Sequence, residues 1–398
     1  MDITIHPSRI SGAVAAIPSK SQAHRVIICA ALADKETTII CRETNRDIEA
    51  TVNCMNALGA NITQTGNGYH VIPVKTAVTS AVLNCGESGS TLRFLLPVAA
   101  ALGVDTTFVM EGRLPERPLS PLWEEMERMG CTLCRPSPNT VRCQGMLAAG
   151  EYTIPGNISS QYITGLLLAL PLLPGDSHIH IVGNLESKPY VDLTRQTIRK
   201  FHVYSTEDFI RGNQRYHSPG YLRIECDWSN AAFFLAAREL GNSIFVHDLD
   251  TDSVQGDRII NSLLPKMREH ITIDTSDIPD LVPVLSIVAA AKKGAVFTNI
   301  QRLRIKESDR VASTIAMIKA LGGNAEATDN TLIVYGTGLR GGIVDAANDH
   351  RIAMSAAIAS TVCHENITIL GAQCVQKSYP KFWEEFSRTG GHYEQYLR

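Results

Sequence analysis

The stretch Glu87-Ser88-Gly89-Ser90-Thr91-Leu92-Arg93, followed by the apolar run Phe94–Leu102, combines the two features that decide the fold of this chain. A serine here can cap a helix, and the run that follows is apolar nearly all round, which predicts a helix buried on every face. Arg93 lies near the start of this helix, where the helix dipole disfavours a cation. An anion bound at the helix start would remove that cost.

Three further helix starts carry a cation in a comparable place. They are Pro18–Arg25, Ser308–Arg310 and Asn348–Arg351. Each cation could instead reach sideways to a surface carboxylate, and for any single site this alternative stays open. Four such starts in one chain indicate a small ligand that carries several negative charges.

Six segments of the sequence are apolar nearly all round and too short to span a membrane. They are Val26–Leu32, Phe94–Leu102, Ile163–Leu172, Ala231–Ala237, Leu281–Ala291 and Ile352–Ile358. Because such helices must be buried on every face, amphipathic strands and further helices have to surround them. The sequence therefore predicts an α/β architecture with helices in the centre and sheets outside.

A pattern recurs along the chain, in which a helix carrying Met or Leu ends near a glycine and is followed by a short strand, a polar turn and a second strand. The clearer copies are Met55–Ala60, Met126–Gly130 and Met317–Gly322, and the weaker ones are Phe201-His202, Met267–His270 and Phe386–Gly390. Hairpins of two strands are expected at 61–71 and 324–333. Six copies in 398 residues imply repeated units of roughly 65 residues, although unrelated helix ends can also look alike.

The bulk composition narrows the class of protein. A chain of 398 residues with 44% hydrophobic residues predicts two or more domains. A net charge of −3 and a pI near 6.5 argue against a nucleic-acid-binding surface. The segment Met1–Pro7 lacks the pattern of a secretory signal, so we expect a soluble, cytoplasmic protein without membrane partners.

The ten cysteines are scattered and do not have the spacing of a disulfide scaffold. Cys131 and Cys134, with Cys143 downstream, resemble half of a zinc site, but no second pair completes it. We therefore expect reduced, mostly structural thiols and no bound metal.

Nine short blocks follow one another along the chain: SKSQAHR from Ser19, GESGSTLR from Gly86, ERPL from Glu116, SSQ from Ser159, SKPY from Ser187, IPD from Ile278, KESDR from Lys306, NDHRIAM from Asn348 and KSYP from Lys377. In this order and spacing they resemble the 5-enolpyruvylshikimate-3-phosphate synthase family, which joins phosphoenolpyruvate to shikimate 3-phosphate. The resemblance implies a two-domain inside-out α/β barrel, each domain built from three βαβαββ units with buried helices and outer sheets.

The resemblance also implies where the domains divide and what they carry. One domain, 1–19 with 228–398, would hold the C-terminal cations for phosphoenolpyruvate. The other domain, 20–227, would hold the shikimate-phosphate site. The crossovers are expected near 18–20 and 225–228.

The binding residues that the resemblance implies are cations, short hydroxyls and a few neutral side chains. For shikimate 3-phosphate they are Lys20, Ser21, Arg25, Ser159, Ser160, Gln161, Ser187, Tyr190, Asp280 and Lys306. For phosphoenolpyruvate they are Lys20, Gly89, Arg117, Gln161, Arg310, Arg351 and Lys377. Guanidinium forks suit carboxylate and phosphate groups, and Gly89 has no side chain to crowd a ligand. Tyr190 would form a flat wall for the ring, with a core tyrosine as the alternative.

The implied reaction is an addition followed by an elimination and needs no cofactor. The shikimate 5-hydroxyl attacks C2 of the enol while C3 is protonated, then phosphate leaves and C3 loses a proton. The resemblance points to Asp280, Glu307 and Lys20 as the catalytic groups, and the surrounding cations favour Asp280 as the base. Glu307 and Asp309 could instead be salt-bridge partners of Lys306 and Arg310.

Several neighbouring residues have simpler interpretations or depart from the family pattern. His350 could be a helix-start histidine that only orients the site, and Asp227 with Ser229 is typical of a helix N-cap. Glu87 and Arg302 stand where asparagine is frequent, so no binding role is assigned to Arg302. Because Gly89 is retained, the resemblance implies sensitivity to glyphosate, although Glu87 could repel this inhibitor.

Two alternative functions stay open at this point. The enolpyruvyl transferase that acts on UDP-N-acetylglucosamine shares the fold, but it typically has Lys-Asn where this chain has Lys20-Ser21, and a cysteine that the loop Glu111–Leu119 lacks. A non-catalytic repeat scaffold would need no convergent cations. The favoured expectation is a monomeric enzyme of the shikimate pathway and aromatic amino acid biosynthesis, whose partners are its two substrates.

Overall fold

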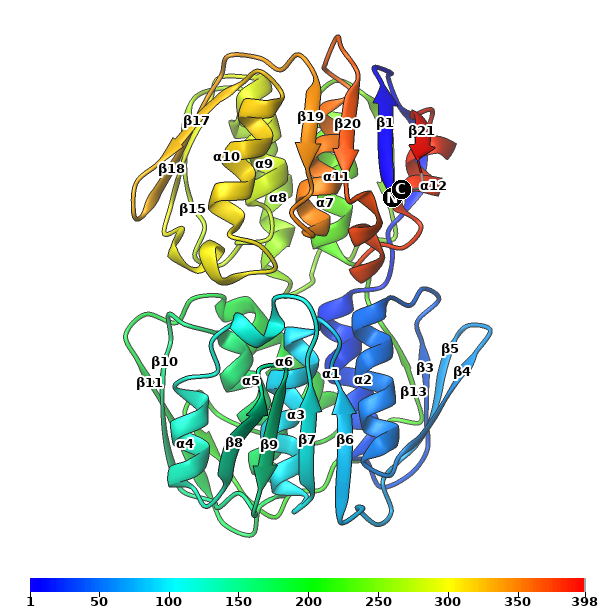
Figure 1. The fold of residues 1–398 in the computed structure, drawn as a ribbon. Coiled ribbons are helices and arrows are strands. Elements are labelled where there is room, and N and C mark those ends of the chain that lie inside the picture. The colour runs from blue at the N-terminus through cyan, green and yellow to red at the C-terminus, as the bar shows by residue number, and fades with distance from the viewer. Residues whose placement is uncertain (397–398) are drawn as a thin grey trace. The chain divides into compact units, whose positions relative to one another are not determined.

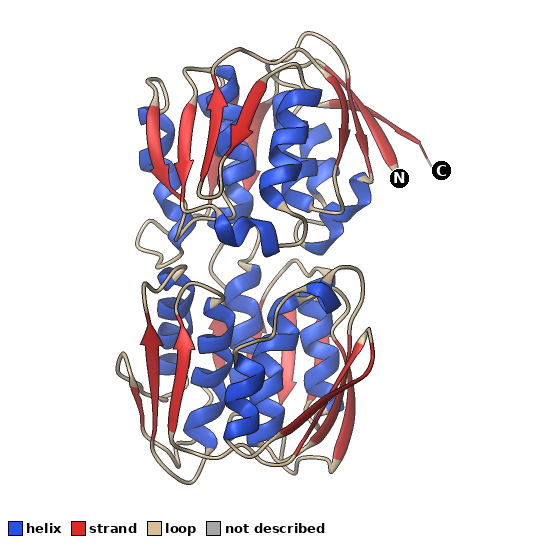
Figure 2. Ribbon diagram, turned by 60° about the vertical axis from the view of Figure 1, so that its left-hand side comes forward, coloured by secondary structure: helices blue, strands red, loops and turns tan. Residues whose placement is uncertain are grey.

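The computed structural model describes residues 1–396, and the chain divides into two compact units. The terminal unit consists of Met1–Ile17 and Cys226–Arg398, and the inserted unit of Pro18–Glu225. Within each unit, strands lie on the outside and helices fill the interior, as Figures 1 and 2 show. Which substrate each unit binds remains a prediction.

The odd-numbered helices form the buried interior of the units. They are α1 (Lys20–Ala31), α3 (Gly89–Ala101) and α5 (Ser160–Ala169) in the inserted unit, and α7 (Trp228–Glu239), α9 (Val282–Ala291) and α11 (His350–Ala359) in the terminal unit. Each contains one of the six apolar segments, and those residues are buried almost throughout. The prediction of centrally buried helices is therefore confirmed. The segment Ile163–Leu172 continues beyond α5 into the short 3-10 helix Leu170–Leu172.

The even-numbered helices account for the repeat. They are α2 (Arg46–Ala57), α4 (Leu122–Arg128), α6 (Lys188–Lys200), α8 (Ile260–Lys266), α10 (Arg310–Ala320) and α12 (Phe382–Arg388). Each of the six copies of the repeat lies at the end of one of these helices, so the repeat reflects a repeated helix end. His202, with φ of 57°, takes the left-handed conformation after α6 that Gly59, with φ of 109°, takes after α2.

In each unit, one continuous βαβαββ segment forms a four-stranded sheet, and the two sheets have the same strand order. In the inserted unit the sheet order is β6 (Ser80–Asn84), β7 (Asp105–Val109), β9 (Thr140–Gln144) and β8 (Thr132–Ser137). In the terminal unit it is β15 (Ile271–Asp274), β16 (Ala295–Thr298), β18 (Thr331–Tyr335) and β17 (Asn324–Ala327). In both sheets the first pair is parallel and the other two pairs are antiparallel.

The remaining sheets complete the outer layers. In the inserted unit they are β13 (Tyr221–Arg223), β3 (Thr37–Ile40), β5 (Gly68–Ile72), β4 (Asn61–Thr65), and β10 (Glu151–Pro155), β11 (Ser177–Val182), β12 (Phe209–Ile210). In the terminal unit they are β19 (Gly342–Asp345), β20 (Ile367–Leu370), β1 (Asp2–His6), β21 (His392–Tyr396), and β14 (Ser243–His247), β2 (Ser11–Ala15). The predicted hairpins are β4–β5 and β17–β18. The expected two-domain inside-out α/β fold is therefore confirmed, although across residues 1–396 the strands form separate sheets and no closed barrel.

Close packing of α3 against α5 fixes the first turns of α3. Pro97 has no N–H to bond the carbonyl of Arg93 four residues earlier. Gly165 of α5 lies against this carbonyl and against the Pro97 ring, so that an added Cβ would collide with both. Position 165 therefore requires a glycine, because no larger residue fits between α5 and α3 at this contact.

None of the helices in residues 1–396 is both long enough and apolar enough to cross a membrane.

Candidate functional site

The four unusual helix starts are confirmed as the first residues of α1, α3, α10 and α11. Their N-cap side chains each accept a hydrogen bond from a backbone N–H of the first turns, and the caps are Ser19, Ser88, Asp309 and Asp349. None of the four helices has an acidic residue in its first turn. The helix dipole at each start is therefore left for a partner from elsewhere.

Arg25 of α1 is a buried cation surrounded by neutral oxygens. Its Nε donates to Oγ1 of Thr194 at 2.7 Å, and Nη1 donates to the carbonyl of Ser21 at 2.6 Å. Nη2 donates to Oγ1 of Thr164 at 3.2 Å and to the carbonyl of Tyr190 at 3.0 Å. Arg25 thus ties α1 to α5 and α6 without neutralising its own charge.

The charge of Arg25 has no carboxylate partner among the described residues. Its guanidinium lies over the ring of Phe94, 4.9 Å from the centroid. Burial lowers the pKa of Arg25 to about 9, against smaller opposing effects of Tyr190 and Cys29, so the side chain is still charged at neutral pH. A buried charge without a counter-ion is costly, and a bound anion would supply the missing negative charge.

Lys20, in contrast, has an acidic neighbour. Its Nζ lies 2.9 Å from Oδ2 of Asp47, at the start of α2. At this site, therefore, the alternative left open by the sequence is correct, because the cation forms an ion pair with a neighbouring carboxylate. Both side chains remain partly exposed, at 16% and 15% of their surface. A ligand anion would have to share Lys20 with Asp47.

The predicted hydroxyl residues lie at the starts of α5 and α6. Ser159 caps α5 and accepts from the N–H of Gln161, and Ser160 is its first residue. Ser187 precedes α6 with φ of 56°, a conformation that a serine seldom adopts, and it is buried. Tyr190, in the first turn of α6, is only partly buried, which argues against the core-tyrosine alternative.

Two guanidinium groups converge on Gly89, the first residue of α3. A Cβ added to Gly89 would lie 2.5 Å from Nη1 of Arg93 and 2.9 Å from Nη1 of Arg117. Arg93 also donates to Oε1 of Gln161 at 3.2 Å and to the carbonyl of Pro118 at 2.9 Å. Because like charges repel, their convergence at a helix N-terminus is typical of an anion site.

The loop that carries Arg117 contacts Glu87. An added Cβ on Gly112, where φ is +55°, would lie 2.5 Å from the carboxylate carbon of Glu87. Gly112 therefore leaves room for the Glu87 side chain against this loop. The departure noted in the sequence thus places an acidic group next to the segment that leads to Arg117.

In the terminal unit, Asp280 is shared by two arginines. Its Oδ1 accepts from Nη1 of Arg310 at 2.8 Å, and its Oδ2 accepts from Nη2 of Arg351 at 2.8 Å. Arg310 also binds Glu307 at 2.7 Å and Asp349 at 3.0 Å, so it holds three carboxylates. Glu307 therefore forms the salt bridge that the sequence analysis gave as its alternative role.

Further predicted residues surround this cluster. Lys377 is buried, and its Nζ donates to the carbonyl of Asn348 at 2.9 Å. His350 is the buried first residue of α11. Asp309 caps α10 through the N–H of Ala312 and forms an ion pair with Arg304 at 3.7 Å.

The cluster shifts the pKa values of its own members. Burial raises the pKa of the Asp280 carboxyl, but Arg351, Arg310 and Lys306 together lower it well below its ordinary value. Burial lowers the pKa of Lys306 to about 8, with Arg302 acting in the same direction and Asp280 opposing it. Asp280 is thus ionised at neutral pH, as a group that accepts a proton must be.

Arg93, Asp47, Thr164 and Thr194 belong to the site region, but they were not among the predicted site residues. Arg93 could have been found, because it is one of the helix-start cations. Thr164 is a polar residue inside an otherwise apolar segment, which indicates a buried hydrogen bond. Asp47 and Thr194 carry no comparable signal in the sequence.

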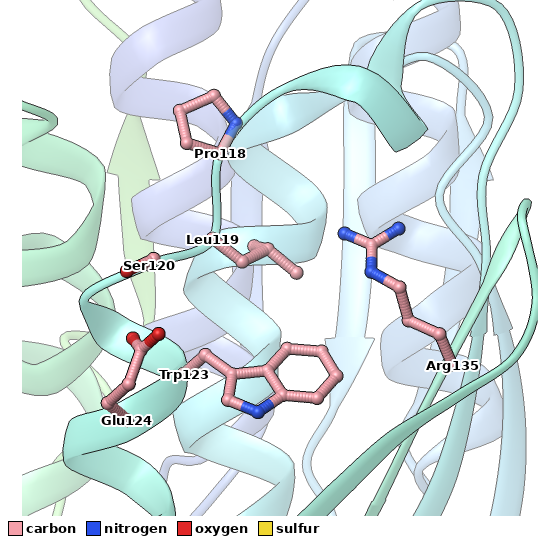
Figure 3. Close-up of a pocket in the computed structure, with 6 residues that line it drawn as sticks. All are labelled: Pro118, Leu119, Ser120, Trp123, Glu124 and Arg135. Carbon is pink, nitrogen blue, oxygen red and sulfur yellow. The ribbon is translucent and has the colours of Figure 1, made fainter.

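A pocket of about 400 Å³ lies elsewhere in the inserted unit (Figure 3). It is lined by Pro118, Leu119, Ser120, Trp123, Glu124 and Arg135, none of which is a predicted site residue. Three of the lining residues, Pro118, Leu119 and Ser120, directly follow Arg117 in the chain. This pocket therefore does not define the site.

The ten cysteines are all free thiols. In residues 1–396, no group of three or more His, Cys, Asp or Glu side chains is arranged to hold a metal ion. Cys131 and Cys143 are buried and Cys134 is exposed.

Comparison with solved structures defines the class of fold first. EPSP synthase from Acinetobacter baumannii matches with a TM-score of 0.82 and 22% identity, covering 99% of this chain and 100% of that one. The enolpyruvyl transferase NikO from Streptomyces tendae matches with a TM-score of 0.78 and 16% identity, covering 99% and 98%. At these identities the likeness shows the two-domain enolpyruvyl-transferase fold.

Sequence comparison then gives the family. The profile described as EPSP synthase (3-phosphoshikimate 1-carboxyvinyltransferase) matches residues 5–277 and 268–386, and the chain belongs to this family. Relatives named 3-phosphoshikimate 1-carboxyvinyltransferase from Clostridium botulinum and Clostridium beijerinckii are each 40% identical to it. The first match covers 98% of both chains and the second 99%.

Proposed function

We propose that this chain transfers the enolpyruvyl group of phosphoenolpyruvate to the 5-hydroxyl of shikimate 3-phosphate. The products are 5-enolpyruvylshikimate 3-phosphate and phosphate, a step of aromatic amino acid biosynthesis. The observation that carries the proposal is the end-to-end similarity, at 40% identity, to relatives of that name. The charges of both units are consistent with it, because both substrates are small and strongly anionic.

In the inserted unit, Arg25 is proposed to bind shikimate 3-phosphate together with Lys20 and Ser21. The starts of α5 and α6 add Ser159, Ser160 and Gln161, and Ser187 and Tyr190, respectively. The support is electrostatic: Arg25 is buried, and its four hydrogen-bond acceptors are all uncharged. A phosphate or carboxylate nearby would receive both its charge and the free N–H groups of the helix starts.

The phosphoenolpyruvate contacts proposed on the inserted unit centre on Gly89. They are Lys20, Gly89, Arg117 and Gln161, and Arg93 joins them because it reaches both Gly89 and Gln161. On the terminal unit the proposed contacts are Arg310, Arg351 and Lys377. Guanidinium pairs of this kind suit a ligand that has both a carboxylate and a phosphate.

Asp280 is the proposed base for the 5-hydroxyl. It is ionised, partly exposed and fixed by two arginines, so that it can accept a proton without moving. Glu307 and Lys20 are the proposed proton carriers at C3, and Lys306 is a proposed contact of shikimate 3-phosphate. Attack at C2 forms a C–O bond while C3 gains a proton, and the later loss of phosphate and of one C3 proton restores the double bond.

The finer expectations of the sequence analysis remain part of this proposal. We place the enzyme in the cytoplasm as a monomer, with its two substrates as partners and with no nucleic acid. The UDP-N-acetylglucosamine enolpyruvyl transferase and a non-catalytic scaffold are the competing functions, and the chain's family argues against both.

Phosphate release measured with alternative acceptors tests the proposal. Phosphate should appear with phosphoenolpyruvate and shikimate 3-phosphate together and with neither alone, and turnover should survive exhaustive chelation of metals. Release of phosphate with UDP-N-acetylglucosamine in place of shikimate 3-phosphate would assign the chain to the other transferase. Binding of neither acceptor would favour the scaffold.

A further inference from the structure

Asp257 is a buried carboxyl group that none of the roles above uses. It lies in the 3-10 helix η3 (Gly256–Ile259), and only 2% of its surface is exposed. Ser229 Oγ of α7 donates a hydrogen bond to Oδ2 of Asp257. The other oxygen, Oδ1, is buried and has no hydrogen-bond partner within the described residues. An ionised carboxylate with a bare buried oxygen is costly, whereas a protonated one is far less so.

The charges around Asp257 also favour its proton. Burial raises the pKa of Asp257 to about 7, and the negative charge of Asp280 adds to this effect. Arg351 of α11 opposes the shift, and Asp227, the N-cap of α7, contributes a smaller repulsion. Asp280 holds both arginine contacts described above, while Asp257 forms no ion pair among residues 1–396.

Helix α7 packs on η3, and its charged residues Arg238 and Glu239 lie near its C-terminal end, nine and ten residues after Ser229. Helix α8 packs on η3, and its one charged residue, Lys266, is exposed. Arg258, on η3 itself, is exposed and donates to the carbonyl of Thr251 at 2.7 Å. Asp280, Arg351 and Asp227 therefore dominate the field at Asp257.

We propose that Asp257 is a positioning residue that must be neutral for phosphoenolpyruvate to bind well at Arg351. The inference rests on the proposed function, because it takes Arg351 as a contact of this substrate. When Asp257 ionises, a second carboxylate besides Asp280 acts on Arg351 and repels the incoming anion. A bound anion in turn favours the proton on Asp257, so binding above pH of about 7 takes up a proton.

The pH dependence of the Michaelis constant for phosphoenolpyruvate tests this coupling. Phosphoenolpyruvate itself titrates near neutral pH, so the parent is compared with Asp257→Asn at each pH. The parent and the variant should agree near pH 5.5. Above about pH 7 the Michaelis constant of the parent should rise relative to that of Asp257→Asn. The ratio of parent to variant should increase by at most about tenfold per pH unit, because one proton is linked to each anion bound.

Two further variants separate this role from a structural one. Ser229→Ala removes a hydrogen bond that favours ionised Asp257, so the rise should begin at a higher pH than in the parent. Asp252→Asn changes an exposed carboxylate in the preceding loop and should follow the parent throughout. The proposal would be overturned if the Michaelis constants of the parent and Asp257→Asn had the same ratio at every pH. It would also be overturned if the Michaelis constant of Ser229→Ala began to rise at the same pH as that of the parent.

Thermal unfolding without ligands tests the protonation of Asp257 independently of the reaction. Since its pKa is raised above the ordinary value near 3.9, the folded parent keeps a proton that the unfolded chain loses between about pH 4 and 7. Between about pH 4 and 7 the parent should therefore lose stability relative to Asp257→Asn. Above about pH 7 the stabilities of the two proteins should change with pH in the same way. A difference that does not change with pH contradicts the inference. The expected difference combined with a parent that never turns over shikimate 3-phosphate would instead reject the proposed function.

Discussion

Nη2 of Arg351 lies 2.8 Å from Oδ2 of Asp280, so the proposed substrate-binding arginine and the proposed base form an ion pair. Asp280 has a second guanidinium partner in Arg310, whose Nη1 donates to its Oδ1 at 2.8 Å. The two arginines keep Asp280 ionised and hold its carboxylate in one orientation. A proposed binding group, Arg351, is thus hydrogen-bonded directly to the proposed proton acceptor, Asp280.

Substitution of Asp280 and of Arg351 should affect different kinetic constants. Asp280→Asn keeps the shape of the side chain but cannot accept a proton, so kcat should fall far more than the Michaelis constant rises. Arg351→Ala removes a charged contact worth about 2–4 kcal/mol when buried, and should mainly raise the Michaelis constant for phosphoenolpyruvate. Steady-state kinetics with saturating shikimate 3-phosphate measures both. Equal effects of the two substitutions on both constants would contradict this division of roles.

Arg25→Gln should separate binding from folding. The neutral side chain still offers donors to Thr164 and Thr194, whose hydroxyls also bond one another at 2.9 Å, so the fold should be kept. Loss of the buried charge should weaken shikimate 3-phosphate binding by about 1.5–3 kcal/mol, measurable by calorimetry. Arg199→Gln, at an exposed position of α6, is the matched control. Unchanged affinity in Arg25→Gln would show that no anion uses this charge.

Binding of shikimate 3-phosphate should weaken as pH rises through about 8. The cause is Lys306, because burial lowers its pKa to about 8 and its charge is lost above that pH. The same shift makes folding more favourable between about pH 8 and 10, where the unfolded chain still holds the proton. Lys306→Arg keeps the charge and should move the loss of affinity to higher pH, while Lys293→Arg, an exposed site, should not. An identical pH profile in Lys306→Arg would remove Lys306 from the binding site.

Glyphosate inhibition tests the surroundings of Gly89. A methyl group at this position would press on the guanidinium ends of Arg93 and Arg117, which can shift, so Gly89→Ala should fold. The longer inhibitor should lose more affinity than the substrate, by about 1–3 kcal/mol. Glu87→Asn removes the acidic group beside Gly112 and should strengthen inhibition. Resistance to millimolar glyphosate in both the parent and Glu87→Asn would refute the assignment of this loop to the phosphoenolpyruvate site.

The helix starts and the buried helices could be predicted because they depend on local pattern. Ser19 and Asp349 cap helices through bonds to residues two or three positions later, and the apolar segments report burial directly. The repeated helix ends could be recognised for the same reason. Even the weak copy at Phe201-His202 marks a true helix end, with a histidine in the usual place of glycine.

The partners of the predicted cations could not be read from the sequence. Lys20 meets Asp47 and Arg25 meets Thr194, contacts that span 27 and 169 residues. Such pairings depend on how helices pack, and many polar residues would have fitted the same pattern. The IPD block contains Asp280, whereas no block contains Asp257. Their different protonation could not be read from the sequence, because it depends on burial and on the two arginine hydrogen bonds that only Asp280 accepts.

Mass spectrometry of the product formed in heavy water shows directly whether the chain acts on shikimate 3-phosphate by addition followed by elimination. If C3 is protonated by solvent-exchanged groups and later loses one of three hydrogens, 5-enolpyruvylshikimate 3-phosphate should carry deuterium at its vinyl carbon, and phosphate should be released in equal amount. A product that contains no deuterium, or that forms only from UDP-N-acetylglucosamine, would contradict the account.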